Sequence, residues 1–133
     1  YFRREIGPEL KERMERIVEE TAKAYGATAE LDYQFLILPT INDDACTAIA
    51  RQAVTEVLGP DAIQESDLVM GGEDFAFYQE DKPGCFIFVG THNPDCNATY
   101  PNHSNYFTSD ESVLAGGARV YAQMAIDWLK QNS

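Results

Sequence analysis

Five consecutive apolar residues, Cys85-Phe86-Ile87-Phe88-Val89, predict a β-strand that is buried on both faces. A second apolar run, Leu68-Val69-Met70, predicts a short strand that ends at two glycines. Helical patterns accompany these strands over 43–58, over 74–79 and over about 109–131. Helices that alternate with buried strands are typical of an α/β layered domain. The sequence therefore predicts an α/β architecture for this region.

Residues that suit helix termini stand at the expected helix ends. Asn42 is expected to cap the helix over 43–58. Thr108-Ser109-Asp110-Glu111 has the form of a capping box, which predicts Thr108 as the N-cap of the last helix. The last helix is expected to turn its apolar side chains inward, namely Val113, Leu114, Val120, Tyr121, Met124 and Trp128.

The first forty residues follow a different pattern. A helix is predicted over 8–25, and Gly7-Pro8 marks its start. Alternation of apolar and polar residues from Ala29 predicts a strand with one buried face, which stops at Pro39. We place a domain boundary at this proline. The helix and strand are expected to belong to an α+β sandwich with one open sheet face. The apolar stripe of the helix comprises Leu10, Met14, Ile17, Val18 and Tyr25.

Length, composition and charge limit the functions that the chain can have. The 133 residues, 44% hydrophobic and 24% charged, have the balance of one globular domain rather than a disordered chain. The chain has no apolar run of about eighteen residues, so we expect no membrane span. The net charge of −12 argues against nucleic acid as a partner. Most of the excess of acidic over basic residues lies in residues 30–111. We interpret these acidic side chains as a solvated surface. The alternative is that the negative electrostatic field of some of them serves a bound cation.

The three cysteines are too few, and odd in number, for a disulfide framework. We expect reduced thiols in a cytoplasmic protein, with a Cys85–Cys96 bridge as the alternative. The sequence begins at Tyr1, within what looks like a structural element, so we expect a fragment of a longer chain. An upstream signal peptide is left open.

Two segments hold candidate functional residues. Gly71-Gly72-Glu73-Asp74-Phe75 follows the end of a predicted strand, which is where ligands bind in open α/β sheets. The simpler interpretation is a turn in which Glu73 and Asp74 cap the following short helix.

The second segment is the polar loop from His92 to His103, which holds both histidines. A lone loop histidine is more often solvated than a metal ligand. Cys85, His92, Cys96 and His103 offer an alternative four-ligand zinc site, although their spacing matches no standard structural zinc pattern.

Four motifs taken together change this interpretation. In order, they are Met70–Tyr78, Pro83–Thr91, Tyr100–Phe107 and Asp110–Gly116. Their order and spacing resemble the amidohydrolase branch of the metal-dependent aminoacylase and carboxypeptidase family. This branch includes hippurate hydrolases and indole-acetyl-amino-acid hydrolases.

The resemblance implies a two-domain enzyme of about three such lengths. It has an aminopeptidase-like catalytic α/β domain with a two-metal site and an inserted α+β sandwich lid that also forms the dimer. On this basis, residues 1–38 are the end of the lid domain, and residues 39–133 are the C-terminal segment of the catalytic domain.

The resemblance also implies the chemistry: hydrolysis of hippurate-like or N-acetyl amino acids by water held between two divalent ions, Zn, Mn, Co or Ni. His103 matches the family's C-terminal metal ligand. Residues Gly71, Gly72, Glu73, Asp74 and Phe75 match its cleft-lining loop, and Glu73 has at most an orienting role. The other ligands and the general base lie upstream in the family, so no catalytic residue is expected here, and the chain alone is expected to be inactive.

The expected partners are an N-acyl amino acid substrate and either the rest of the enzyme or a second copy of the chain, in a homodimer. A non-catalytic binding or assembly module that keeps the fold is the alternative. The upstream sequence would discriminate between the two. The acyl group, the amino acid and the metal are left open.

Overall fold

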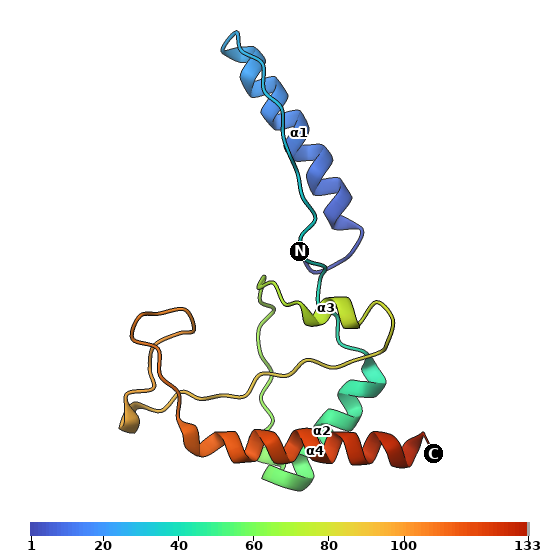
Figure 1. The fold of residues 1–133 in the computed structure, drawn as a ribbon, viewed down its shortest axis with the longest axis vertical. Coiled ribbons are helices and arrows are strands. Elements are labelled where there is room, and N and C mark those ends of the chain that lie inside the picture. The colour runs from blue at the N-terminus through green and yellow to red at the C-terminus, as the bar shows by residue number, and fades with distance from the viewer. Residues whose placement is uncertain (133) are drawn as a thin grey trace. The chain divides into compact units, whose positions relative to one another are not determined.

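The computed structural model describes residues 1–132 and divides into two compact units, each of which is described by itself. The first unit consists of residues 1–41 and 67–83, and the second of residues 42–66 and the chain from residue 84 onward. The first unit holds α1 (Ile6–Ala24) and α3 (Phe75–Tyr78) (Figure 1). The second holds α2 (Asp44–Leu58), η1 (Pro60–Ala62), η2 (Pro94–Cys96), η3 (Glu111–Val113) and α4 (Leu114–Gln131).

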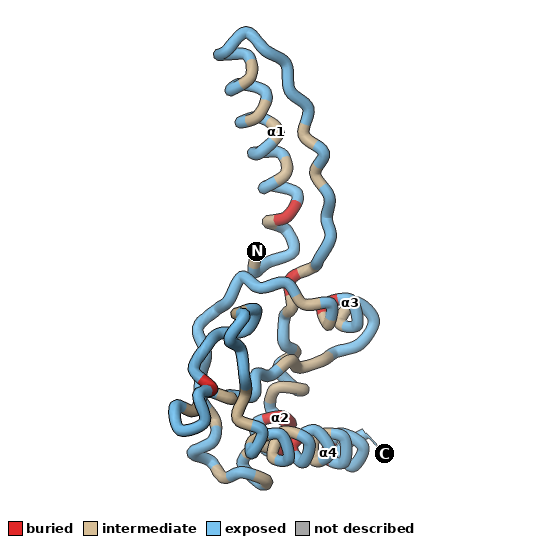
Figure 2. The backbone as a smooth tube through the Cα atoms, turned by 60° about the vertical axis from the view of Figure 1, so that its left-hand side comes forward, coloured by how far each residue is buried: buried red, intermediate tan, exposed pale blue. Residues whose placement is uncertain are grey.

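Helix α1 confirms the predicted helix over 8–25, although it begins two residues earlier. After Gly26, which has a positive φ of 69°, residues 27–38 run back along the helix (Figures 1 and 2). Gly7 is buried because Tyr1 and Phe35 pack against it, and a Cβ atom there would lie 2.9 Å from Tyr1. The apolar stripe of α1 stays largely exposed, and Ile17 is 62% exposed.

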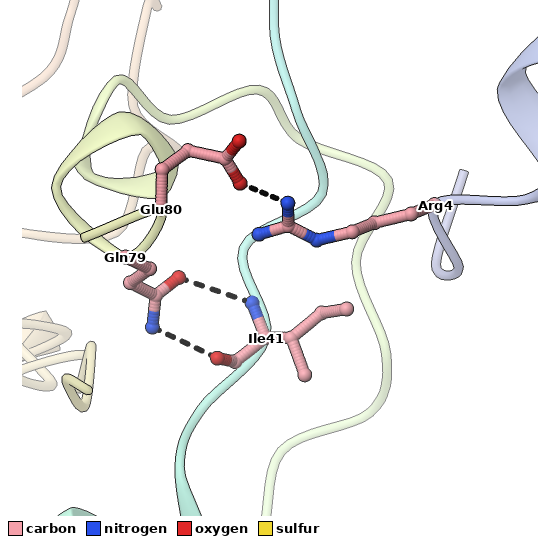
Figure 3. A network of polar contacts seen from close by, with 4 residues as sticks. All are labelled: Arg4, Ile41, Gln79 and Glu80. Atoms are coloured by element: carbon pink, nitrogen blue, oxygen red, sulfur yellow. Dashed lines mark hydrogen bonds and ion pairs between the residues drawn. The ribbon is translucent and has the colours of Figure 1, made fainter. Parts of the chain in front are cut away.

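Polar contacts fasten the segment around α3 within the first unit (Figure 3). The Gln79 side-chain amide makes two hydrogen bonds to the backbone of Ile41: Oε1 accepts from the amide N–H at 3.2 Å, and Nε2 donates to the carbonyl at 2.8 Å. Arg4 forms an ion pair with Glu80. Ala76 in α3 is fully buried. These contacts join the C-terminal end of α3 to Ile41 and Arg4 within the first unit.

The second unit is built on the packing of α2 against α4. The small or aliphatic buried positions of these helices are Ile49, Ala50 and Ala53 in α2, and Val120 in α4 (red in Figure 2). Gly116 extends this interface, because a Cβ atom there would lie only 3.2 Å from Leu58 Cδ2. Small residues at these positions allow the two helices to approach closely.

The buried face of α4 differs from the predicted one. Val120 is buried as expected, but Tyr121 is 78% exposed and Trp128 is 47% exposed. Asp127 is buried in their place, and its Oδ1 accepts a hydrogen bond from Gln123 Nε2 at 2.8 Å. Positions 120, 123 and 127 follow the helical period along one face, whereas 121 and 128 lie on another. Helix α4 therefore has one buried face of mixed polarity and a second face on which Tyr121 and Trp128 are exposed.

The predicted strands are not formed in residues 1–132, where the structure contains only an isolated bridge between Asn93 and Ala98. The segments 29–38, 68–70 and 85–89 are irregular, and Phe88 is 69% exposed. An apolar run favours burial, but a strand forms only where a neighbouring chain segment supplies the ladder of backbone hydrogen bonds. Such a neighbour is absent from the described residues, so the predicted α/β layering is not built there.

The side-chain caps also differ from the predicted ones. Asp43 caps α2 in place of Asn42, and its carboxylate accepts from the Cys46 amide at 2.9 Å, which lowers the pKa of Asp43. Asn42 instead pairs with the backbone of Phe86, donating to its carbonyl and accepting from its amide, both at 2.8 Å. The primary amide of Asn42 matches both groups of a peptide unit, and a carboxylate offers acceptors only.

The last helical region begins with η3, which is capped by Asp110 rather than by Thr108. No helix in residues 1–132 has both the length and the apolar character that crossing a membrane requires. The predicted domain boundary at Pro39 stays a prediction.

Candidate functional site

His103 occupies the third position of a tight turn. The Ser104 amide donates to the Pro101 carbonyl at 3.2 Å and closes the turn, and the His103 amide donates to Asn102 Oδ1 at 3.2 Å. The φ angle of His103 is 69°, in the left-handed region. Among the described residues, Asn97 is the only other non-glycine residue with a positive φ. Such conformations are sparsely populated, and they concentrate at ligand-binding and catalytic sites.

The residues after His103 brace this turn from within the loop. Ser104 accepts two backbone hydrogen bonds, from Tyr106 to its hydroxyl at 3.2 Å and from Phe107 to its carbonyl at 3.1 Å. The rings of Tyr100 and Tyr106 lie on either side of the turn in sequence and contact each other, with centroids 5.3 Å apart. His103 itself is exposed. The turn thus holds an imidazole at the surface, where a ligand can reach it.

A second set of contacts anchors the start of the same loop. Asn93 and Ala98 exchange backbone hydrogen bonds of 2.8 and 2.9 Å around η2. Asn93 Nδ2 also donates to Asp110 Oδ2 at 2.7 Å, and the Asp110 amide donates to the Thr91 carbonyl at 3.2 Å. Asp110 therefore ties the loop that carries His103 to the beginning of the last helical region. The sequence placed Asp110 in a capping box and in a family motif, but its hydrogen bond to Asn93 was not predicted.

The Asp110 carboxylate should make the stability of the chain sensitive to acid. Hydrogen bonds from Ser112 and then from Asn93 hold the pKa of Asp110 below its usual value. A lowered folded-state pKa contributes stability above the unfolded-state pKa, about 3.9, and this stability is lost as the pH falls through the folded value. We expect the urea midpoint of Asp110→Asn to fall less than that of the parent chain between about pH 5 and pH 3.

Asp95→Asn serves as the matched control, because Asp95 lies in η2 of the same loop and is exposed. Its midpoint should follow the parent at every pH. If the urea midpoints of the parent and Asp110→Asn change in parallel with pH, Asp110 does not have the lowered pKa assigned to it.

The Gly71–Phe75 segment lies in the first unit and leads directly into α3. Gly71, Gly72 and Asp74 are exposed, while Glu73 and Phe75 are half-buried. A Cβ atom on Gly72 would lie 2.9 Å from Ile37 Cδ1, so a side chain at this position would require Ile37 to move. The predicted side-chain cap is wrong, since Asp74 stands at the N-cap of α3 without a side-chain hydrogen bond there.

The two candidate segments therefore belong to different units. Residues 1–132 contain no group of three or more His, Cys, Asp or Glu side chains that could hold a metal ion. This result overturns the alternative zinc site of Cys85, His92, Cys96 and His103.

Comparison with known proteins shows the family. The profile of peptidase family M20/M25/M40 matches residues 4–127. The chain is 35% identical over 122 residues, 91% of its length, to thermostable carboxypeptidase 2 of Saccharolobus solfataricus. It is 34% identical to an N-acetylcysteine deacetylase of Bacillus subtilis over 94% of its length, and 34% identical to IAA-amino acid hydrolase ILR1-like 4 of Arabidopsis thaliana over 91%.

The chain belongs to peptidase family M20/M25/M40. This finding confirms the predicted resemblance to metal-dependent amidohydrolases. Peptidases of this family generally depend on divalent metal ions. The matches cover 30%, 31% and 28% of the three relatives, in the order given, so the chain spans less than a third of their length.

Proposed function

We propose that this chain is the C-terminal part of a metal-dependent amidohydrolase that cleaves the amide bond of N-acyl amino acids. The principal support is His103, an exposed imidazole that a hydrogen-bonded turn holds at a φ of 69° within the region that matches the family. Two relatives are named for hydrolases of N-acyl amino acids, which supports hippurate-like or N-acetyl amino acids as the substrate class.

In this proposal, His103 supplies one neutral imidazole ligand to a two-metal centre. The ions would be zinc, manganese, cobalt or nickel, since imidazole suits all four. A bound divalent ion lowers the pKa of water and polarises a carbonyl group. The remaining ligands and the general base would come from residues outside this chain. The role of this chain is to fix the direction of the imidazole through the Pro101–Ser104 turn and the Asn93–Asp110 anchor.

The segment Gly71–Phe75 would line the substrate cleft of the complete enzyme. Residues 1–38 would end the lid domain, and residues 39–133 would complete the catalytic domain. Phe88 and Val69 are 69% and 65% exposed in segments with strand-like sequences, which supports coverage by the rest of the enzyme. Homodimers and a cytoplasmic location remain part of the proposal.

A chimeric enzyme tests this function directly. The chain replaces the matched part of the Bacillus subtilis N-acetylcysteine deacetylase, and the purified chimera is assayed with hippurate and several N-acetyl amino acids in the presence of Mn or Zn. We expect metal-dependent release of the free amino acid. The 133-residue chain alone should release none, because its described residues supply only one proposed ligand.

The outcome separates the enzyme from the non-catalytic alternative. A chimera that unfolds cooperatively and binds metal, but releases no amino acid from any of these substrates, would favour a binding or assembly module. Metal-dependent turnover by the isolated chain that survives repurification would contradict the assignment of the other ligands to residues outside it.

A further inference from the structure

The N-terminal end of α2 and the two residues before it contact residues 84–86. The Asp43 amide donates to the Gly84 carbonyl at 3.0 Å, and Asn42 makes two hydrogen bonds to the Phe86 backbone. Between these two contacts in the sequence lies Cys85, whose Sγ is 3.6 Å from the Thr47 hydroxyl oxygen. The Cys85 sulfur therefore lies against the beginning of α2.

Cys46 lies in this same turn of α2, directly before Thr47. It is half-buried, and it shares a helix face with the buried residues Ala50 and Ala53, four and seven positions later. Burial is the main cause that raises the pKa of Cys46, followed by the Asp43 carboxylate and then by Cys85. The Cys85 sulfur contacts Thr47, the residue directly after Cys46, so both thiols lie at the beginning of α2.

Cys96 has a different environment. It is exposed in η2, and its thiol contacts the Asn93 carbonyl at 3.6 Å. All three cysteines are free thiols in this structure. The contacts therefore select Cys46 and Cys85 as a pair, rather than the pair Cys85 and Cys96 that the sequence suggested as an alternative.

We propose that Cys46 and Cys85 form an oxidisable thiol pair, which a small disulfide such as oxidised glutathione converts into an intrachain disulfide between α2 and residues 84–86. In the first step, one cysteine sulfur attacks the glutathione disulfide, forms a mixed disulfide and releases one glutathione. In the second step, the other cysteine attacks the mixed disulfide at the protein sulfur and releases the second glutathione. The two thiol protons pass to the two glutathione molecules, so two protein thiols are oxidised and one small disulfide is reduced.

The surroundings favour Cys85 as the first nucleophile. The thiolate is the attacking species, and both burial and Asp43 disfavour the thiolate of Cys46. Cys46 then attacks the mixed disulfide on Cys85. The bridge would clamp the beginning of α2 to the segment that leads into the His103 loop, and by restricting the unfolded chain it should raise the urea midpoint.

Intact mass and peptide mapping of the 133-residue chain test the pair. The chain is incubated with oxidised glutathione near pH 8, where thiols begin to ionise, then acidified, alkylated and digested without reduction. We expect a Cys46–Cys85 cross-linked peptide, a loss of about 2 Da that dithiothreitol reverses, and a higher urea midpoint. The same chain in urea serves as the reference for pairing without the fold, and there the three pairings should compete.

Serine variants provide matched controls in a Cys96→Ser background. Cys46→Ser should take up one glutathione on Cys85, and Cys85→Ser should take it up on Cys46 more slowly. The proposal is overturned if the folded chain carries separate glutathione adducts on Cys46 and Cys85 without the cross-link. It is also overturned if the cross-link forms no faster in the folded chain than in urea. Both of these outcomes are measured by peptide mapping of the parent chain, so the test holds even if a variant fails to fold.

Discussion

Replacing His103 by asparagine in the chimeric enzyme should lower hydrolysis of N-acyl amino acids by at least about 100-fold, because it removes a metal ligand. Asparagine, like histidine, is among the non-glycine residues that adopt a positive φ most often, so the Pro101–Ser104 turn should persist. We therefore expect an unchanged urea midpoint together with a lower metal content. Turnover, bound metal by elemental analysis and unfolding are measured on the same preparation.

His92→Asn is the control for this variant. His92 is the other histidine of the chain, it is exposed, and it lies in the same loop. Its replacement should leave turnover and metal content near the parent values. Normal turnover with normal metal content in His103→Asn would show that the ligand role assigned to His103 is wrong.

Replacing Ala53 by leucine should lower the free energy of unfolding of the chain by about 1 to 3 kcal/mol. Ala53 is fully buried where α2 packs on α4, and the small side chains there leave little room for a larger one. The added carbons would push the two helices apart or force unfavourable rotamers. Urea unfolding followed by circular dichroism measures the change.

Ala48→Leu provides the matched comparison, because Ala48 is an exposed residue of the same helix. The two changes are chemically identical and have similar helix propensities, so their difference isolates the interface. Ala48→Leu should stay within about 0.5 kcal/mol of the parent. Equal effects of the two substitutions would mean that Ala53 does not face a packed helix.

The helices could be predicted because their signals are local. Glycine and proline mark their ends, and apolar residues recur with the helical period, so the predicted bounds differ by only a few residues from α1 and α2. The strands could not be predicted in the same way. The apolar run 85–89 favours burial, but pairing depends on a neighbour that can lie anywhere in the sequence. The burial of Asp127 was also missed, because an apolar stripe does not reveal which helix face meets a partner.

Part of the candidate site could also be predicted from the sequence, and part could not. The family resemblance singled out His103, whereas its positive φ could be seen only in the structure. The Asn93–Asp110 hydrogen bond joins residues seventeen positions apart, and no spacing rule connects them. The sequence did contain a signal for the cap at Asn93, because asparagine often caps a helical turn and Asn93 directly precedes Pro94. In the structure, the Asn93 side chain accepts from the Asp95 amide at 3.0 Å.

The exposed face of α4 that carries Tyr121 and Trp128 gives the chain an intrinsic fluorescent probe. Trp128 is the only tryptophan in the sequence, and it lies on this face with 47% of its surface exposed. Indole emission depends on contact of the ring with water, and tryptophan often lies where one protein surface meets another. A protein surface that covers this face would shift the emission to shorter wavelengths and shield the ring from iodide quenching. Tryptophan fluorescence can therefore follow the coverage of α4 in unlabelled protein, with no contribution from a second tryptophan in this chain.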